Sequence, residues 1–215
     1  VAAGKGVSGI PYNPASIAFI DQSETYFAQT NYLAGITHNV ISYGTHAGPS
    51  DYVAFHLFYL NSGDMDVTNE YYPDGEDFRV LSMAFRLTYA RKLTDRLKVG
   101  GSFNYIRDQI YETQMQTAAF DLGSNFDTGI YGFILGMSIT NFGPEVQYGG
   151  EGLHQVVPDT IDVDERLSKI TEKFPLPLVF RVGVKNDIMG PNGSFIKNNT
   201  HTLTLSADAL NPSDY

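Results

Sequence analysis

The chain alternates apolar residues with small or polar ones at a period of two, in segments of roughly ten residues. In the clearest segment, Leu81, Met83, Phe85, Leu87 and Tyr89 alternate with Ser82, Ala84, Arg86, Thr88 and Ala90. Successive side chains of a β-strand point to opposite faces, so this pattern predicts strands with one apolar and one polar face. Further segments of this kind are 97–105, 131–139, 178–184 and 201–209, and less regular ones are 23–33, 35–46, 51–60 and 117–125. We therefore predict an all-β chain of about nine strands.

The polar faces of these segments combine glycine, serine and threonine with a few long polar side chains. A soluble β-sandwich and a membrane β-barrel both fit such a pattern, because each has one polar and one apolar face. The segment lengths approach those of strands that cross a membrane at a tilt, which favours an antiparallel transmembrane barrel. We predict that Leu81, Met83, Phe85, Leu87, Leu135 and Met137 face lipid, and that Arg86, Lys98, Asn104 and Arg181 face the lumen. An Arg86→Ala change should then be far milder than Phe85→Arg.

The connections between these segments differ in length. The short turns at 94–96 and 127–129 fall at one end of the predicted sheet, and the long connections 62–77 and 144–176 fall at the other. Outer-membrane barrels have short periplasmic turns and longer outer loops. We therefore expect the long connections to be extracellular, although the connection at 188–200 is longer than this rule prefers.

The second long connection carries a helical pattern. Val163, Leu167, Ile170 and Phe174 recur at helical spacing, Asp162 and Glu165 fit a capping box, and Pro175 follows. We predict a helical loop insertion near 159–174, which either packs on the barrel rim or docks a partner. Tyr71 and Tyr72 in the other long connection add aromatic residues of the kind enriched at interfaces.

Composition excludes several classes of protein. A formal net charge of -10 argues against a nucleic-acid partner, which needs clustered Lys and Arg. The absence of cysteine excludes disulfides and thiolate metal sites. No apolar run approaches the roughly 18 residues that a membrane-spanning helix requires.

No catalytic or metal-binding pattern stands out in the sequence. The histidines, His38, His46, His56, His154 and His201, lack the spacing of a metal site, and nucleophile and nucleotide motifs are missing. We expect a protein that is not an enzyme and holds no cofactor. The acidic residues between 64 and 77 form either a solvated outer loop or a calcium site, although their spacing matches no EF-hand.

Several stretches occur in an order that resembles one known family. Residues 12–18 (YNPASIA) resemble a "WNPAGLA" stretch, and 87–100 (LTYARKLTDRLKVG) resemble "YARRLTDRLSVG". Residues 121–123 (DLG), 138–143 (SITNFG) and 207–212 (ADALNP) resemble "DLG", "SISNLG" and "ADLVHPND". This ordered set is similar to the PorV/PorQ family of outer-membrane proteins, relatives of the FadL long-chain fatty acid transporters. Ser16 stands where the family often has glycine, and the 151–174 insertion is unusual for it.

The resemblance implies a FadL-like barrel of about fourteen strands, of which about nine lie in this chain. It implies a plug segment over 1–22 that contains the motif Asn13, Pro14 and Ala15, and a barrel over 23–215 that is incomplete at its C-terminal end. It also implies a protein of the bacterial outer membrane, surrounded by its lipid, that binds or shuttles exported proteins for type IX secretion. Its partners would be a secretion translocon or exported cargo. From the apolar and aromatic residues of the two long connections, we expect such a partner to bind at Tyr71, Tyr72, Val163, Leu167, Ile170 and Phe174. The alternatives are a FadL-like transporter or pore for hydrophobic small molecules, which the charged lumen residues disfavour, and a structural surface protein.

Overall fold

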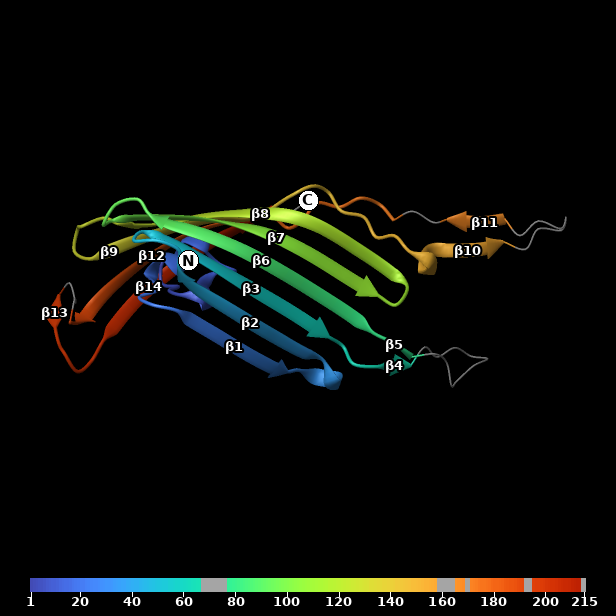
Figure 1. Cartoon of the computed structure of the whole chain (residues 1–215), viewed down its shortest axis with the longest axis horizontal. Coiled ribbons are helices and arrows are strands. Elements are labelled where there is room, and N and C mark those ends of the chain that lie inside the picture. The colour runs from blue at the N-terminus through green and yellow to red at the C-terminus, as the bar shows by residue number, and fades with distance from the viewer. Residues whose placement is uncertain (67–76, 158–164, 169–170, 192–194, 214–215) are drawn as a thin grey trace.

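One large, mostly antiparallel sheet dominates the computed structural model, which describes residues 1–66, 77–157, 165–168, 171–191 and 195–213. Its nine long strands pair in the order β1-β2-β3-β6-β7-β8-β9-β12-β14 (Figure 1). They are β1 (Glu24–Asn31), β2 (Thr37–His46), β3 (Asp51–Asn61), β6 (Val80–Lys92), β7 (Leu97–Ile110), β8 (Thr113–Asp127), β9 (Phe133–Phe142), β12 (Val179–Gly190) and β14 (Leu203–Pro212). The prediction of an all-β chain with about nine strands is confirmed.

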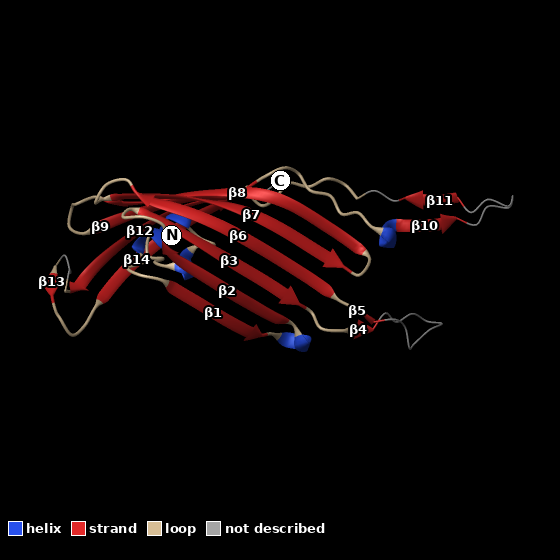
Figure 2. Cartoon of the chain, viewed as in Figure 1, coloured by secondary structure: helices blue, strands red, loops and turns tan. Residues whose placement is uncertain are grey.

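Shorter elements lie around this sheet (Figure 2). β13 (Ile196–Lys197) pairs with β12 in parallel, and β4 (Met65–Asp66) with β5 (Asp77–Phe78) and β10 (His154–Val157) with β11 (Glu165–Ser168) form two-stranded sheets. The short 3₁₀ helices are η1 (Val7–Gly9), η2 (Pro14–Phe19), η3 (Leu33–Gly35) and η4 (Glu151–Leu153). In the described part of the chain, none of the helices has the length and apolarity needed to cross a membrane.

The two faces of the sheet differ sharply in chemistry. The outer face exposes large apolar side chains, among them Phe27, Phe85, Leu87, Phe103, Phe120, Leu122, Met137, Ile139, Phe180 and Leu205. The inner face holds the buried polar residues, including Ser42, His56, Thr88, Ser102, Asn104, Asp121, Asn125, Ser138 and Lys185. Leu81, Met83 and Leu135 alternate in step with the outer residues of β6 and β9 and are half-buried. The alternation in the sequence therefore corresponds to a real division between the two faces.

Residues 1–22 lie against the inner face of the curved sheet (Figure 1). η1 and η2 contact strands on that side, and η2 packs on β3, β6, β7 and β8. The main apolar cluster is shared between this segment and the sheet, and it consists of Val7, Ile10, Ile17, Ala18, Ile20, Tyr52, Ala54 and Ala90. The hydrophobic core thus sits between the N-terminal segment and the strands β3 and β6, and the segment is held by burial of apolar surface.

Two features of the strands differ from the sequence prediction. β7 ends later than predicted, at Ile110, and β8 begins earlier than predicted, at Thr113. The two strands are joined by a two-residue connection, Tyr111 and Glu112, in which Tyr111 has φ 54°. This connection is short, yet it lies at the same end as the long ones, whereas the connection between β12 and β14 is long and lies at the other end. Each end of the sheet therefore carries both short and long connections, and the predicted separation of short turns from long loops holds only in part.

The helix predicted near 159–174 is wrong over Glu165–Ser168. These residues form β11, which pairs antiparallel with β10, for example Gln155 with Leu167. Apolar spacings of three and four residues fit a helix locally, but here the backbone hydrogen bonds go to a neighbouring strand rich in β-branched residues. Asp162, Val163 and Ile170 lie outside the described residues, as do Tyr71 and Tyr72.

Candidate functional site

The motif Asn13, Pro14 and Ala15 fastens the N-terminal segment to the inner face. The Asn13 side chain caps η2, because its Oδ1 accepts a hydrogen bond from the Ala15 amide at 3.0 Å. Its Nδ2 donates to the carbonyl oxygen of Ser124 in β8, also at 3.0 Å. In β9, Ser138 Oγ donates to the Tyr12 carbonyl oxygen at 2.7 Å. One side chain therefore both starts a helix and anchors it to the sheet.

Glycines on the inner face provide room for this segment. A Cβ atom at Gly100 would lie 2.7 Å from the Ala15 nitrogen and the Pro14 carbonyl carbon. A Cβ at Gly136 would lie 2.6 Å from Ala2 Cα. Backbone can approach backbone this closely only where no side chain intervenes. The sequence showed these glycines only as small members of a polar face, so their role in seating the segment was missed.

Charged groups form a network in the middle of the inner face. Arg86 Nε lies 3.7 Å from Asp121 Oδ2, with the two side chains 15% and 1% exposed. Asp121 Oδ1 accepts a hydrogen bond from the backbone amide of Asn141 at 2.7 Å, and Arg181 Nη1 donates to Thr140 Oγ1 at 2.7 Å. Asn104, directly opposite Arg86 in the strand register, is fully buried. The predicted lumen residues Arg86, Asn104 and Arg181 are thus brought together on the inner face.

Lys98, the fourth predicted lumen residue, lies toward the end of the sheet where β6 turns into β7. Its Nζ is 4.4 Å from the centre of the Phe19 ring, which belongs to the N-terminal segment. An ammonium group over an aromatic face is a favourable contact. Lys98 therefore contacts the segment and not the network around Arg86 and Asp121.

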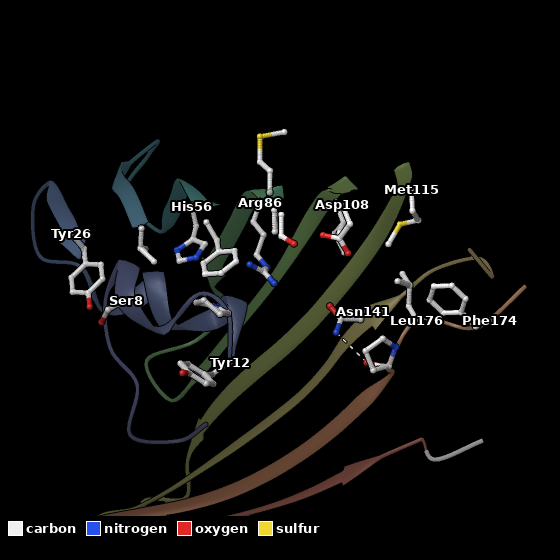
Figure 3. A pocket seen from close by; sticks show the side chains of 18 of the residues that line it. Ser8, Tyr12, Tyr26, His56, Arg86, Asp108, Met115, Asn141, Phe174 and Leu176 are labelled. Atoms are coloured by element: carbon white, nitrogen blue, oxygen red, sulfur yellow. Dashed lines mark hydrogen bonds between the residues drawn. The ribbon is translucent and has the colours of Figure 1, made fainter. Parts of the chain in front are cut away.

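A cavity of about 620 Å³ lies between the N-terminal segment and the other end of the sheet (Figure 3). Ser8 and Tyr12 of the segment line one side, His56 and Arg86 project from the strands, and apolar side chains predominate in the wall. His56 Nδ1 is hydrogen-bonded to Ser42 Oγ at 2.8 Å. Because Ser42 is fully buried, this pair fixes the imidazole ring and does not present a nucleophile to the cavity.

The base of the connection between β9 and β12 closes another side of this cavity. Val146 and Phe174 exchange backbone hydrogen bonds of 2.8 and 2.9 Å, and the Phe174 ring stacks on Tyr148 at 5.8 Å. Leu176 packs with Met115 of β8 in a small apolar cluster. Phe174, predicted to bind a partner, thus lines the inner cavity with a ring that is 38% exposed.

The acidic connection after β3 contains an ion pair in its described part. Arg79 pairs with Asp64, and its Nη2 donates to Asp64 Oδ2 at 3.1 Å. This hydrogen bond holds the pKa of the Asp64 carboxyl below its ordinary value. Glu70, Asp74 and Glu76 lie outside the described residues. Of the acidic residues considered for a calcium site, the structure therefore describes Asp64, Asp66 and Asp77. Asp64 already has a guanidinium partner.

The described residues contain no group of three His, Asp or Glu side chains placed to hold a metal ion. Their inner face instead offers a seated segment, an ion-pair network and a cavity. A scan against models of protein families finds no match to the chain, and a search of curated proteins finds none either. The functional assignment therefore rests on this geometry and on the motifs in the sequence.

Proposed function

We propose that the chain forms part of the wall of an outer-membrane β-barrel of the PorV/PorQ type, which binds exported proteins for type IX secretion without catalysing a reaction. One observation carries the membrane assignment: the outer face of the sheet is apolar and exposed. Leu87, Leu122 and Phe180 are 56%, 64% and 44% exposed there. A soluble sandwich would cover such a face with a second sheet, whereas lipid covers it in a barrel.

The inner face supports a binding role over conduction. The N-terminal segment packs on β3 and β6 to β8, and the Asn13 anchor joins it to β8. A plug of this kind would occupy the lumen, so a partner protein would meet the molecule at its outer loops. Loops on a rigid sheet are common places for recognition. The link to export itself comes from the ordered resemblance in the sequence.

The membrane assignment can be tested with tryptophan reporters, because these 215 residues contain no Trp. We expect Leu122→Trp fluorescence to be quenched in bilayers whose acyl chains carry bromine. Asp95→Trp, in the turn between β6 and β7, is the matched control and should be quenched much less. A soluble protein in the absence of detergent, or an unquenched Leu122→Trp, would contradict the assignment.

The binding role can be tested on the hairpin of β10 and β11. Replacing residues 154–168 by a short Gly-Ser linker leaves the base of the connection, including the pairing of Val146 with Phe174, unchanged. We expect this variant to insert normally and to lose co-purification with a translocon or cargo. Unchanged co-purification would exclude the hairpin as the binding surface and direct attention to the segment around Asn13.

A second candidate function is the binding of a hydrophobic small molecule, and the cavity of about 620 Å³ specifically favours it. Phe58, Ile106 and Leu176 supply apolar walls, and His56 and Arg86 supply polar groups. Native mass spectrometry of the detergent-extracted protein would reveal a bound lipid. We expect Ile106→Trp to displace such a ligand by filling the cavity, and no retained mass in the unchanged protein would exclude this function.

A further inference from the structure

Two lysines from distant parts of the chain meet at Phe19 on the inner face, and a third lies beside one of them. Lys5 comes from the N-terminal segment, Lys98 from β7 and Lys185 from β12. The Nζ atoms of Lys5 and Lys98 lie 5.7 and 4.4 Å from the centre of the Phe19 ring. Lys185 is only 4% exposed, which is unusual for a lysine. We call these three residues the lysine cluster.

The acidic groups nearby do not balance the lysine cluster. Asp187 is the carboxylate within it: its Oδ1 lies 3.2 Å from Lys185 Nζ and accepts a hydrogen bond from Thr204 at 2.6 Å. Burial lowers the pKa of Lys5, the ammonium group of Lys185 lowers it further, and Asp187 opposes both effects. The ammonium groups of Lys5 and Lys185 therefore share one carboxylate, and like charges this close repel each other.

Other charges near Lys98 do not remove this excess. Lys92 stands directly opposite Lys98 in the pairing of β6 with β7, a destabilising arrangement for like charges. Asp95 and Asp127 are the acidic residues near Lys98. Asp127 Oδ1 already accepts a hydrogen bond from the Gly129 amide at 2.8 Å. Lys92 thus offsets one of the two added carboxylates, and the neighbourhood remains cationic.

Asn125 supplies an independent sign of a ligand at this place. It stands directly opposite Lys98 in the pairing of β7 with β8 and is 1% exposed. Neither its Oδ1 nor its Nδ2 has a hydrogen-bond partner among the described residues. Buried amides are nearly always hydrogen-bonded, so an unpaired one calls for an explanation. An oxyanion beside the lysine cluster would accept from its Nδ2.

We propose that the lysine cluster and Asn125 form a binding site for a phosphate group. Lysine binds phosphate as a compact charge with three donors, and charge-assisted hydrogen bonds are the strong ones. The ligand is either a soluble phosphate compound or the phosphate of a lipid headgroup, because both present the same oxygens. The site is separate from the outer loops and does not depend on the proposed role in export.

Calorimetric titration of the purified full chain with inorganic pyrophosphate tests the site. We expect saturable binding that Lys98→Gln weakens by about tenfold or more, as expected for loss of a hydrogen bond between charged groups. Lys5→Gln should act in the same direction. Lys173→Gln, at an exposed lysine in the connection between β9 and β12, is the matched control and should leave the affinity unchanged. Absence of binding by the folded protein, or equal weakening by the control, would overturn the proposal.

Acetylation footprinting gives a readout that does not depend on variants. Pyrophosphate should protect Lys5 and Lys98 of the unchanged protein from acetylation, and should leave Lys173 reactive. A short-chain phosphatidylglycerol in the same assay distinguishes the two sources of phosphate. Protection by both compounds indicates a headgroup site, and protection by pyrophosphate alone indicates a soluble ligand. Protection by neither would overturn the proposal.

Discussion

Gly100 and Gly101 are neighbours in β7 that point to opposite faces, and they provide a matched pair for testing the seat of the N-terminal segment. A Cβ at Gly100 would meet backbone atoms of Pro14 and Ala15 at 2.7 Å, whereas one at Gly101 meets nothing closer than 3.5 Å. We expect Gly100→Val to cost about 1–3 kcal/mol by overpacking and to release the segment. Gly101→Val should preserve it. Limited proteolysis within residues 1–22 is the measurement, and equal cleavage of both variants would contradict the close fit.

Arg86 illustrates how burial changes an expectation based on alternation alone. A lumen residue in water would tolerate truncation, but Arg86 is the partner of the buried Asp121 carboxylate. We expect Arg86→Met to cost about 3–5 kcal/mol, because it leaves that charge uncompensated. For comparison, Phe85→Arg on the outer face should cost about 2–4 kcal/mol near the midplane of a bilayer.

A double-mutant cycle distinguishes this ion pair from simple packing around Arg86. Adding Asp121→Asn to Arg86→Met removes the orphaned charge, so unfolding by urea should show partial recovery of stability. The Asp121 contact with the Asn141 amide can be kept by the Asn oxygen. Additive losses in the two single variants would mean that the pair contributes nothing of its own.

At the scale of elements, one bulge interrupts the regular pairing near the end of β9. The register between β8 and β9 shifts between Phe120 and Leu122, and Asn141 in the bulge has φ 64°. Its Nδ2 donates to the Pro177 carbonyl oxygen at 3.1 Å, which joins the bulge to the returning connection. The bulge therefore couples the sheet to the wall of the cavity.

This bulge predicts an order of stabilities. Asn141→Val should destabilise the protein by about 1–3 kcal/mol, because a β-branched residue resists positive φ and the hydrogen bond is lost. Asn141→Gly should cost less, since glycine accepts this backbone conformation and only the hydrogen bond disappears. Thermal unfolding of the two variants in detergent checks the order. A glycine variant as unstable as the valine variant would show that backbone strain is unimportant here.

Long segments in which apolar and polar residues alternate regularly predicted strands well, whereas short irregular patterns did not predict the secondary structure. The segment 81–89 corresponds to β6, because its period of two extends over most of the strand, Val80–Lys92. The end of β7 was placed too early and the start of β8 too late, since Arg107 and Gln116 interrupt the apolar face although the backbone pairing continues. Leu167 and Phe174, which were taken for parts of a helix, lacked any sequence signal of the residues with which they pair. Local periodicity does not reveal which distant strand a segment will meet.

At the scale of the whole molecule, the proposed orientation has a direct test. Connections after β3 and β9 lie at one end of the sheet, and the turn between β6 and β7 lies at the other. We expect a protease site inserted after Gly63 to be cut on intact cells, and one inserted after Asp95 to be cut only after the membrane is broken. The reverse pattern would exclude the orientation, and cutting of both sites on intact cells would argue against a spanning wall.

The sequence predicted which residues belong to the inner face, but it did not predict which of their side chains contact each other. Arg86, Asn104 and Arg181 were assigned to the same face from alternation alone. The pairing of Arg86 with Asp121 and the convergence of Lys98 with Lys5 depend on the curvature of the sheet and on the path of the N-terminal segment. Neither is encoded in a local pattern, because both join residues far apart in the chain.

The anchoring of Asn13 also has a consequence for the order of folding. Its hydrogen bond to Ser124 spans 111 residues, and the one from Ser138 to Tyr12 spans 126. The surface that receives the segment exists only after β7, β8 and β9 have paired, and contacts this distant in sequence form slowly. The residues that precede every strand should therefore dock last. During refolding, pulsed hydrogen exchange should show amides of β7 and β8 protected before the amide of Ala15, and simultaneous protection would contradict this order.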